Sequence, residues 1–129
     1  MSSREVVESF FAYWGAQDVE LTSSLFHDGM VYKLHVDTTD VPYGGEWLGR
    51  EPCRHAMFSL LEEFDYLKYE PTILSVRGDV VRAQVCFKYQ HRRTGGVLEA
   101  TRRLVFRVKG VLIARVGGVH DAQLFEAFL

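Results

Sequence analysis

From Tyr66 onward, the spacing of hydrophobic residues in this chain changes from about one in 3.6 residues to one in two. The most regular helical stretch runs from Pro52 to Phe64. Pro52 suits a first helical turn, where its missing N–H costs no hydrogen bond. A helix with one apolar face needs a surface to cover, and the strands expected after it supply that surface. Its apolar residues fall on one narrow arc: Cys53, Ala56, Met57, Leu60, Leu61 and Phe64.

Two shorter amphipathic patterns precede this helix. Ser2 and Glu5 have the spacing of a capping box, which predicts a helix that ends near Gly15. Asp18 can cap a second short helix, which the His-Asp-Gly sequence at residues 27–29 ends. Residues 30–37 alternate and predict a strand, and residues 38–49 predict a loop. The first helix has an apolar stripe made of Val7, Phe10, Phe11 and Trp14.

After Phe64 the pattern is that of a β-sheet. Residues 121–129 predict a short helix or tail. Two helices, a strand, a third helix and a meander together predict a single α+β domain over residues 1–129. In this domain a curved, mostly antiparallel sheet wraps around the helices of the N-terminal half. Alternation and turn residues predict the four strands of the meander at residues 66–77, 80–91, 98–108 and 111–120.

Composition narrows the class of protein. The 15 Lys and Arg and 17 Asp and Glu give a net charge of −2, which does not indicate a nucleic-acid-binding protein. No apolar run approaches the roughly 20 residues that span a bilayer, and the polar N-terminus does not resemble a signal peptide. Cys53 and Cys86 are interpreted as free thiols in a reducing compartment rather than as a disulfide. We therefore expect a cytoplasmic protein with no membrane or nucleic-acid partner.

The loop before the long helix is the most specific stretch, Pro42-Tyr43-Gly44-Gly45-Glu46-Trp47-Leu48-Gly49-Arg50. With residues 3–7, Asp18, residues 25–28 and the Val-His-Asp sequence at 119–121, it makes the chain resemble the nuclear-transport-factor-2-like superfamily, in particular its SnoaL-like branch. The resemblance covers essentially the whole chain. It implies a cone-shaped fold with a deep pocket between the concave sheet and the helices, usually in a homodimer. It implies no single reaction, because isomerases, cyclases, hydrolases, dehydratases and non-catalytic binders share this fold.

The ketosteroid isomerase in this superfamily uses a tyrosine on its first helix and two carboxylic acids. The positions that correspond here are Phe10, Leu34 and Leu104. None of these side chains can transfer a proton. The resemblance therefore does not bring the isomerase mechanism to this chain.

Candidate site residues follow from strand alternation, which places residues two apart on one face. On the strand at residues 80–91, every second residue from Ala83 to His91 is predicted to face the pocket. On the next strand, the same holds for every second residue from Ala100 to Val108. On the last strand, the predicted set is Leu112, Ala114, Val116, Gly118 and His120. The predicted catalytic groups are His120, Asp121, Arg102 and Tyr89, because histidine beside arginine and tyrosine can do acid–base chemistry. The predicted walls of a substrate pocket are Tyr32, Trp47, Phe87, Phe106 and Trp14.

Several of these assignments have alternatives. Asp121 either orients His120 or caps a C-terminal helix. Arg102 and Arg103 have opposite parity, so one of them points away from the pocket. His91 lies beside two arginines at a turn, which favours exposure to solvent. Neither a metal-ligand spacing nor a nucleotide-binding motif occurs, so no cofactor is expected.

Two functional hypotheses remain. In the first, the chain binds a small hydrophobic molecule and is either a cofactor-free acid–base enzyme or a binding protein. In the second, the pocket has no catalytic role, and the outer face of the sheet is an interaction or assembly surface. A mixed basic and apolar strip on that face suggests such a surface: Thr101, Arg103, Val105, Arg107 and Lys109. The same face carries Gln84, Cys86 and Lys88 beside Thr101, Arg103 and Val105, and this mixed character predicts a homodimer through it.

Overall fold

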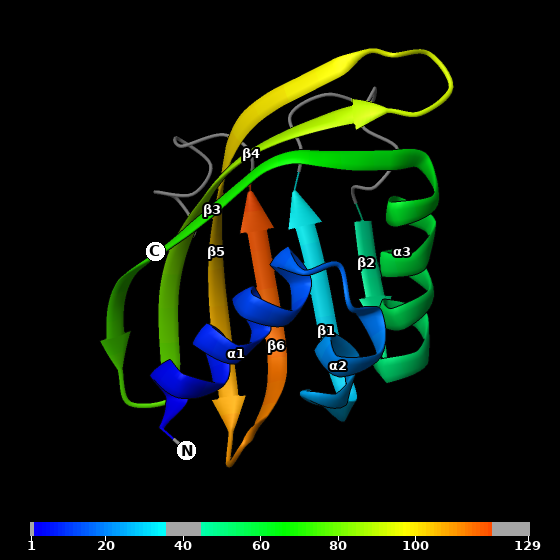
Figure 1. Cartoon of the computed structure of the whole chain (residues 1–129). Helices are drawn as coiled ribbons and strands as arrows, with labels where there is room; N and C mark the ends of the chain where they lie inside the picture. Colours follow the sequence, from blue (N-terminus) through cyan, green and yellow to red (C-terminus); the bar gives the residue numbers. More distant parts are fainter. Residues whose placement is uncertain (1, 36–44, 120–129) are drawn as a thin grey trace.

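The computed structural model describes residues 2–35 and 45–119. These residues form three helices and six strands in one sheet (Figure 1). The helices are α1 (Ser3–Gly15), α2 (Val19–Ser24) and α3 (Arg50–Glu63). The strands are β1 (Phe26–His35), β2 (Gly45–Leu48), β3 (Phe64–Arg77), β4 (Val80–His91), β5 (Val97–Lys109) and β6 (Leu112–Val119).

The sheet has the strand order β2-β1-β6-β5-β4-β3. Neighbours are antiparallel except β1 and β6, which run parallel. As Figure 1 shows, β3 and β4 bend strongly over one end of α1, and the helices lie on the concave side. The predicted α+β fold with a curved, mostly antiparallel sheet is confirmed. Among the described residues, no helix is long and apolar enough to cross a membrane.

Helix α1 fills the concave side of the sheet. The predicted capping box is present, because Ser2 Oγ accepts a hydrogen bond from Glu5 N and the Glu5 carboxylate accepts one from Ser2 N. The helix contacts β3, β4, β5 and β6. Phe10 and Phe11 meet the ring of Phe106 at centroid distances of 5.2 and 5.5 Å. The buried residues of α1 are Val6, Val7, Phe10, Phe11 and Trp14.

Helix α3 lies at the side of the concave surface of the sheet, whereas the sequence pattern predicted that it covers this surface. It contacts β1, β2 and β3, so most of the concave surface belongs to α1. Its apolar stripe is real, since Cys53 and Met57 are buried and Leu60 and Leu61 pack partly buried against the core. The helix begins at Arg50 rather than Pro52, after Gly49 at φ 95°. This left-handed conformation favours glycine at the end of the loop.

The predicted loop at residues 38–49 is wrong at its C-terminal end, where β2 pairs with β1. Part of the glycine-rich sequence forms a short edge strand, in which Leu48 pairs with Val31 and Gly45 pairs with Leu34. The predicted start of the first strand is also wrong, because β1 begins at Phe26. Its register against β6 shifts between Phe26 and Val31. The intervening residues are the ones whose turn-like sequence suggested a break.

Arg50 secures this irregular part of β1 to α3. Its guanidinium donates two hydrogen bonds to the Phe26 carbonyl, from Nε at 3.0 Å and from Nη2 at 2.8 Å. It also pairs with Asp28 at 3.0 Å. The N–H of Gly49 donates to the Met30 carbonyl. The end of the glycine-rich sequence therefore has a structural role, which is to join the helix to the strand.

Replacing Phe106 by alanine tests the packing of α1 on the sheet. Phe106 lies on β5, is completely buried and contacts Phe10 and Phe11 of α1. The substitution therefore removes the ring and leaves a cavity. We expect the free energy of unfolding to fall by about 3–5 kcal/mol in urea denaturation. Thr101→Ala, on the exposed face of the same strand, should cost less than about 1 kcal/mol. Equal losses in the two variants would contradict this account of the core.

Candidate functional site

Arg102 points to the interior of the cone. On β4 the alternation is confirmed, because Val81, Ala83, Val85, Phe87 and Tyr89 are all buried. Arg102 is opposite Val85 and therefore shares this face, whereas Arg103 is opposite Gln84 on the outer face. The guanidinium carbon of Arg102 lies 5.0 Å from the centre of the Phe87 ring. The structure thus decides which of the two neighbouring arginines faces inward.

Four tyrosines surround this cation. Tyr66 and Tyr89 are directly opposite on β3 and β4, and their rings stack at 4.2 Å with an interplanar angle of 3°. The Tyr89 hydroxyl donates to the Tyr66 hydroxyl at 3.0 Å. The Tyr69 ring stacks on the other side of Tyr66 at 5.5 Å. We call Tyr32, Tyr66, Tyr69 and Tyr89, together with Arg102, the tyrosine–arginine cluster.

Tyr32 reaches Arg102 across an intervening strand. The two residues lie on β1 and β5, with β6 between them. On β6, Val116 is the neighbour of Tyr32, and Gly118, which has no side chain, follows two residues later, opposite Leu104. The Arg102 guanidinium lies close enough to the Tyr32 hydroxyl to oppose the rise in the pKa of that hydroxyl. The aromatic wall therefore continues from β3 and β4 to the far side of the cone.

Sequence reasoning missed Tyr66 and Tyr69 as site residues. They are three apart, so simple alternation places them on opposite faces of the sheet. The register of β3 against β4 shifts between Tyr66 and Lys68, which leaves Leu67 as an extra residue. Leu67 is 52% exposed, and both tyrosines join the interior. The one available signal was an apolar side chain, Leu67, at a position where the pattern required a polar one.

Burial controls the ionisation of the cluster. It raises the pKa of Tyr66 and Tyr69 well above the ordinary value of 10.0, and the neighbouring Tyr89 hydroxyl adds to both rises. Burial also raises the pKa of Tyr32, against the opposing effect of Arg102. For Arg102 itself, burial favours the neutral form, but the tyrosine oxygens more than offset it and raise the pKa. The cluster is therefore a persistent cation surrounded by neutral hydroxyl groups.

The other predicted wall residues have different surroundings. Trp14 and Phe87 pack against the tyrosine–arginine cluster, since the Trp14 ring meets Tyr66 edge-on at 5.6 Å and the Phe87 ring lies 4.3 Å from that of Tyr89. Phe106 is enclosed in the core beneath α1. Trp47 pairs with Tyr32 across β1 and β2, with ring centroids 5.4 Å apart.

His120 and Asp121 lie outside the described residues. The residues of β6 that were predicted to face the interior are buried at Val116 and Gly118. At the start of the strand the prediction is wrong. There Ile113 is buried in place of Leu112 and Ala114, because the register shifts between Arg107 and Val108.

His91 is less exposed than its basic neighbours suggested. Its side chain keeps only 20% exposure and lies 3.7 Å from the Glu63 carboxylate. Its Nδ1 accepts a hydrogen bond from the Thr94 N–H, and its ring meets Phe64 edge-on at 5.0 Å. These contacts give His91 a structural role in the turn between β4 and β5.

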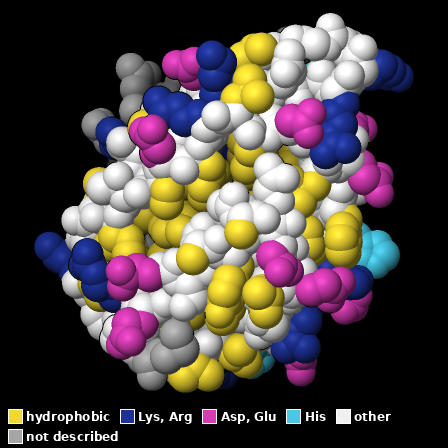
Figure 2. All heavy atoms as spheres, in the orientation of Figure 1, with side chains coloured by type: hydrophobic (Ala, Val, Ile, Leu, Met, Phe, Trp, Pro, Cys, Tyr) yellow, Lys and Arg dark blue, Asp and Glu magenta, His cyan; other side chains and the backbone are white. Residues whose placement is uncertain are grey.

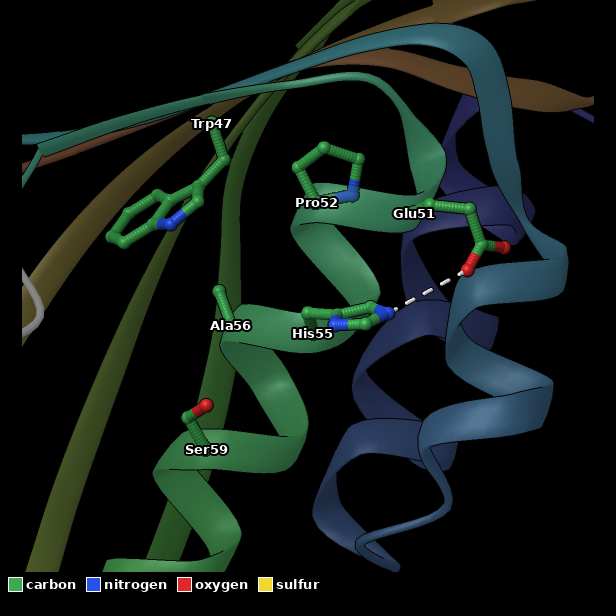
Figure 3. A pocket seen from close by; sticks show the side chains of 6 residues that line it. All are labelled: Trp47, Glu51, Pro52, His55, Ala56 and Ser59. Carbon is green, nitrogen blue, oxygen red and sulfur yellow. Dashed lines mark ion pairs between the residues drawn. The ribbon is translucent and has the colours of Figure 1, made fainter.

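A second concave feature lies outside the cone, between β2 and α3. It is an open groove of about 500 Å³. Figure 3 shows the Trp47 indole on one side and α3 on the other, with the Glu51–His55 ion pair at the outer rim. His55 is 74% exposed, as its place off the apolar stripe predicted. The groove is lined by Trp47, Glu51, Pro52, His55, Ala56 and Ser59.

Trp47 therefore lies between the groove and the interior. Its carbonyl is 3.7 Å from the Cys53 sulfur, and burial raises the pKa of that thiol from 9.0 to about 11.

In the described ranges, 2–35 and 45–119, no group of three or more metal-ligating side chains comes together. Figure 2 shows hydrophobic side chains gathered between α1 and the arch of β3 and β4, with charged side chains around them.

The raised tyrosine pKa values predict loss of stability in alkali. The unfolded chain releases these protons first, so stability present below pH 10 falls as the pH rises above it. Urea denaturation between about pH 8 and pH 11 should show this fall in the free energy of unfolding. The double variant Tyr66→Phe/Tyr69→Phe should show a shallower fall. Cys53 contributes with the same sign, so part of the dependence should remain. An unchanged slope in the double variant would mean that these hydroxyls ionise freely in the folded protein.

Comparison with known proteins agrees with this architecture. The family model described as a SnoaL-like domain matches residues 7–116. An NTF2-like protein from Burkholderia thailandensis has 20% identity and a TM-score of 0.81, covering 98% of this chain and 96% of its own. An NTF2-like protein from Burkholderia xenovorans has 14% identity and a TM-score of 0.79, with the same coverage.

A third solved structure contains a ligand. It is a hypothetical protein with a ketosteroid isomerase-like fold from Catenulispora acidiphila, in complex with trimethylamine. It has 17% identity and a TM-score of 0.73, and the match covers 92% of this chain and 86% of that one. At these identities the likeness concerns the fold alone. The search of curated proteins finds no match. The match over residues 7–116 shows that the chain belongs to the SnoaL-like domain family.

Proposed function

We propose that this protein binds a small hydrophobic molecule inside the cone and anchors an electron-rich oxygen of that molecule on Arg102. The observation that carries the proposal is the tyrosine–arginine cluster, in which a guanidinium lies among four tyrosines and Phe87. Aromatic walls favour an apolar ligand, and the cation favours a carboxylate, enolate or polarised carbonyl. Membership of the SnoaL-like family supports a small-molecule pocket.

The chemistry that suits this arrangement is acid–base catalysis without a cofactor. An enolate formed by removal of a proton next to a carbonyl carries its negative charge on oxygen, where a nearby guanidinium stabilises it. Arg102 would stabilise that charge, and Tyr89, hydrogen-bonded to Tyr66, would orient the oxygen. His120 and Asp121, which follow β6 in the sequence, are our candidates for the group that moves the proton.

Ligand binding to Arg102 variants tests the anchor. We expect 2-naphthoate to bind the wild type, and Arg102→Met to weaken that binding roughly 10- to 150-fold because one charge-assisted hydrogen bond is lost. Arg102→Lys should retain part of the affinity. Arg103→Met is the matched control, since its side chain lies on the outer face. Trimethylamine, a cation at neutral pH, should bind Arg102→Met better than the wild type. Equal affinity of 2-naphthoate for the wild type and Arg102→Met would remove the basis of the proposal.

Exchange of protons for deuterium separates an enzyme from a binding protein. If the site catalyses enolate formation, a bound aryl ketone in D₂O should lose its α-protons faster with the wild type than with His120→Ala or Asp121→Asn. NMR measures this exchange directly. Binding of 2-naphthoate together with an uncatalysed exchange rate would support the alternative function, a non-catalytic binding domain.

We also propose a homodimer through the outer face of the sheet around Cys86 and Thr101. Support comes from the neutral centre of this face, where the Cys86 sulfur is 3.7 Å from the Thr101 hydroxyl. Sedimentation equilibrium measures the mass in solution, and Cys86→Arg should shift the protein toward monomer. A monomeric wild type at micromolar concentration would contradict the homodimer.

A further inference from the structure

The net charge of −2 conceals a strong separation of charge along the chain. Residues 64–119 contain eleven Lys and Arg but only four Asp and Glu. The remainder contains four Lys and Arg and thirteen Asp and Glu. The basic segment is the β3–β6 meander, whereas the helices lie in the acidic segment. The outer face of the meander therefore has an electrostatic character that the overall charge does not indicate.

Strand register gathers four arginines at one end of this outer face. Arg77 is opposite Val80, Val80 is opposite Arg107, and Arg107 is opposite Arg115. These pairs form one row across β3, β4, β5 and β6. Arg82 lies two residues along β4 from that row, opposite Val105. We call these four residues, Arg77, Arg82, Arg107 and Arg115, the arginine patch.

Two arginines of the patch lie so that their charges destabilise the folded chain when no partner neutralises them. Arg107 and Arg115 are directly opposite, and like charges in such a pair repel each other. Within the described part of the chain, none of the four arginines forms an ion pair. Asp79, in the adjoining turn, pairs with none of them. The Nε of Arg82 is buried without a hydrogen-bond partner among the described residues.

The other end of the same sheet differs. There three cations have a carboxylate close by: Lys68 with Glu70, Lys88 with Glu99, and Arg92 with Asp65. Three of the four carboxylates of the meander are paired in this way, which leaves the arginine patch with an excess of positive charge. An anionic partner would supply what the patch lacks.

We propose that the arginine patch, at the end of the outer face away from the Cys86–Thr101 centre of the proposed homodimer, binds an acidic segment of a partner protein. Guanidinium groups match carboxylates in a two-pronged geometry, and arginine is enriched at the centres of protein interfaces. Val80 and Val105 lie between the arginines and offer apolar contacts to aliphatic side chains of such a segment. The outer faces of β4 and β5 present no aromatic side chain on which a nucleic-acid base could stack. These features favour an acidic protein segment over a nucleic acid.

Fluorescence anisotropy with a labelled acidic peptide tests the proposal. The probe is a twelve-residue peptide with six Glu, two Val and four Ser, and its control has Gln in place of every Glu. We expect the Glu peptide alone to bind the wild type, with an affinity that falls as salt rises. Arg107→Gln/Arg115→Gln should weaken binding by about 10-fold. Arg92→Gln/Arg93→Gln removes the same charge at the opposite end of the sheet and should change affinity less than about twofold.

Other outcomes would overturn the proposal. Tighter binding of a labelled 20-nucleotide DNA than of the Glu peptide, with the same dependence on Arg107 and Arg115, would identify a nucleic-acid surface. A change of oligomeric state in the double variant would identify a contact between copies of this chain. Binding of neither probe would mean that the patch has no acidic ligand. Because Arg102 points to the opposite face, its variants should leave peptide binding unchanged, so this test is independent of the proposed pocket.

A stability measurement checks the repulsion on which the argument rests. Arg115→Glu places an acid opposite Arg107, and its Tm should exceed that of Arg115→Gln. A lower Tm for Arg115→Glu would show that the two arginines do not repel each other in the folded protein, which would remove the reason to expect an anionic partner.

Discussion

The rest of the structure depends on the packing of the aromatic face of α1 against the concave side of the sheet. Phe10 and Phe11 contact Phe106, and Trp14 contacts Tyr66, so one helix joins the centre of the sheet to its outermost long strand. A flat sheet could not make both sets of contacts. The register shifts in β1, β3 and β6 bend the strands around the helix. Removal of apolar surface from water drives this arrangement.

The interior of a cone formed in this way is apolar, and burial there disfavours a charged group. Arg102 is acceptable there because aromatic rings and hydroxyl groups replace part of its hydration. The same burial keeps the tyrosines neutral. A ligand oxygen would therefore meet a cation and neutral hydroxyl groups in a medium where electrostatic interactions are strong. This is a physical reason why the fold hosts binding and catalysis with different residues in different proteins.

The two faces of the sheet have opposite requirements. The inner face must be apolar because α1 covers it, so Arg102 on that face needs an aromatic setting. The outer face has no helix over it in the described part of the chain, and it carries most of the basic residues of the meander. Val80 and Val105 lie between the arginines of the arginine patch, so the surface is both basic and apolar. The small-molecule site and the interaction surface that we propose therefore lie on opposite sides of one sheet.

Local pattern alone was enough to predict the three helices, the meander and the inward set on β4, because capping residues and alternation act over a few neighbouring residues. The family resemblance also followed from the sequence, and the match over residues 7–116 confirms it. The sequence named Arg102, Tyr89, Phe87, Trp14 and Tyr32, but it left open whether Arg102 or Arg103 points inward.

Tertiary structure decided the features that depend on contacts between distant strands. Tyr66 and Tyr69 share a face only because Leu67 bulges against β4, and a bulge reflects the fit of two strands rather than the sequence of one. Strand β2 exists because residues 45–48 find a partner in β1. Arg107 and Arg115 are eight residues apart, and the register of β5 against β6 makes them neighbours. Pairing register is set by the packing of the whole sheet, and for that reason it could not be predicted from either strand alone.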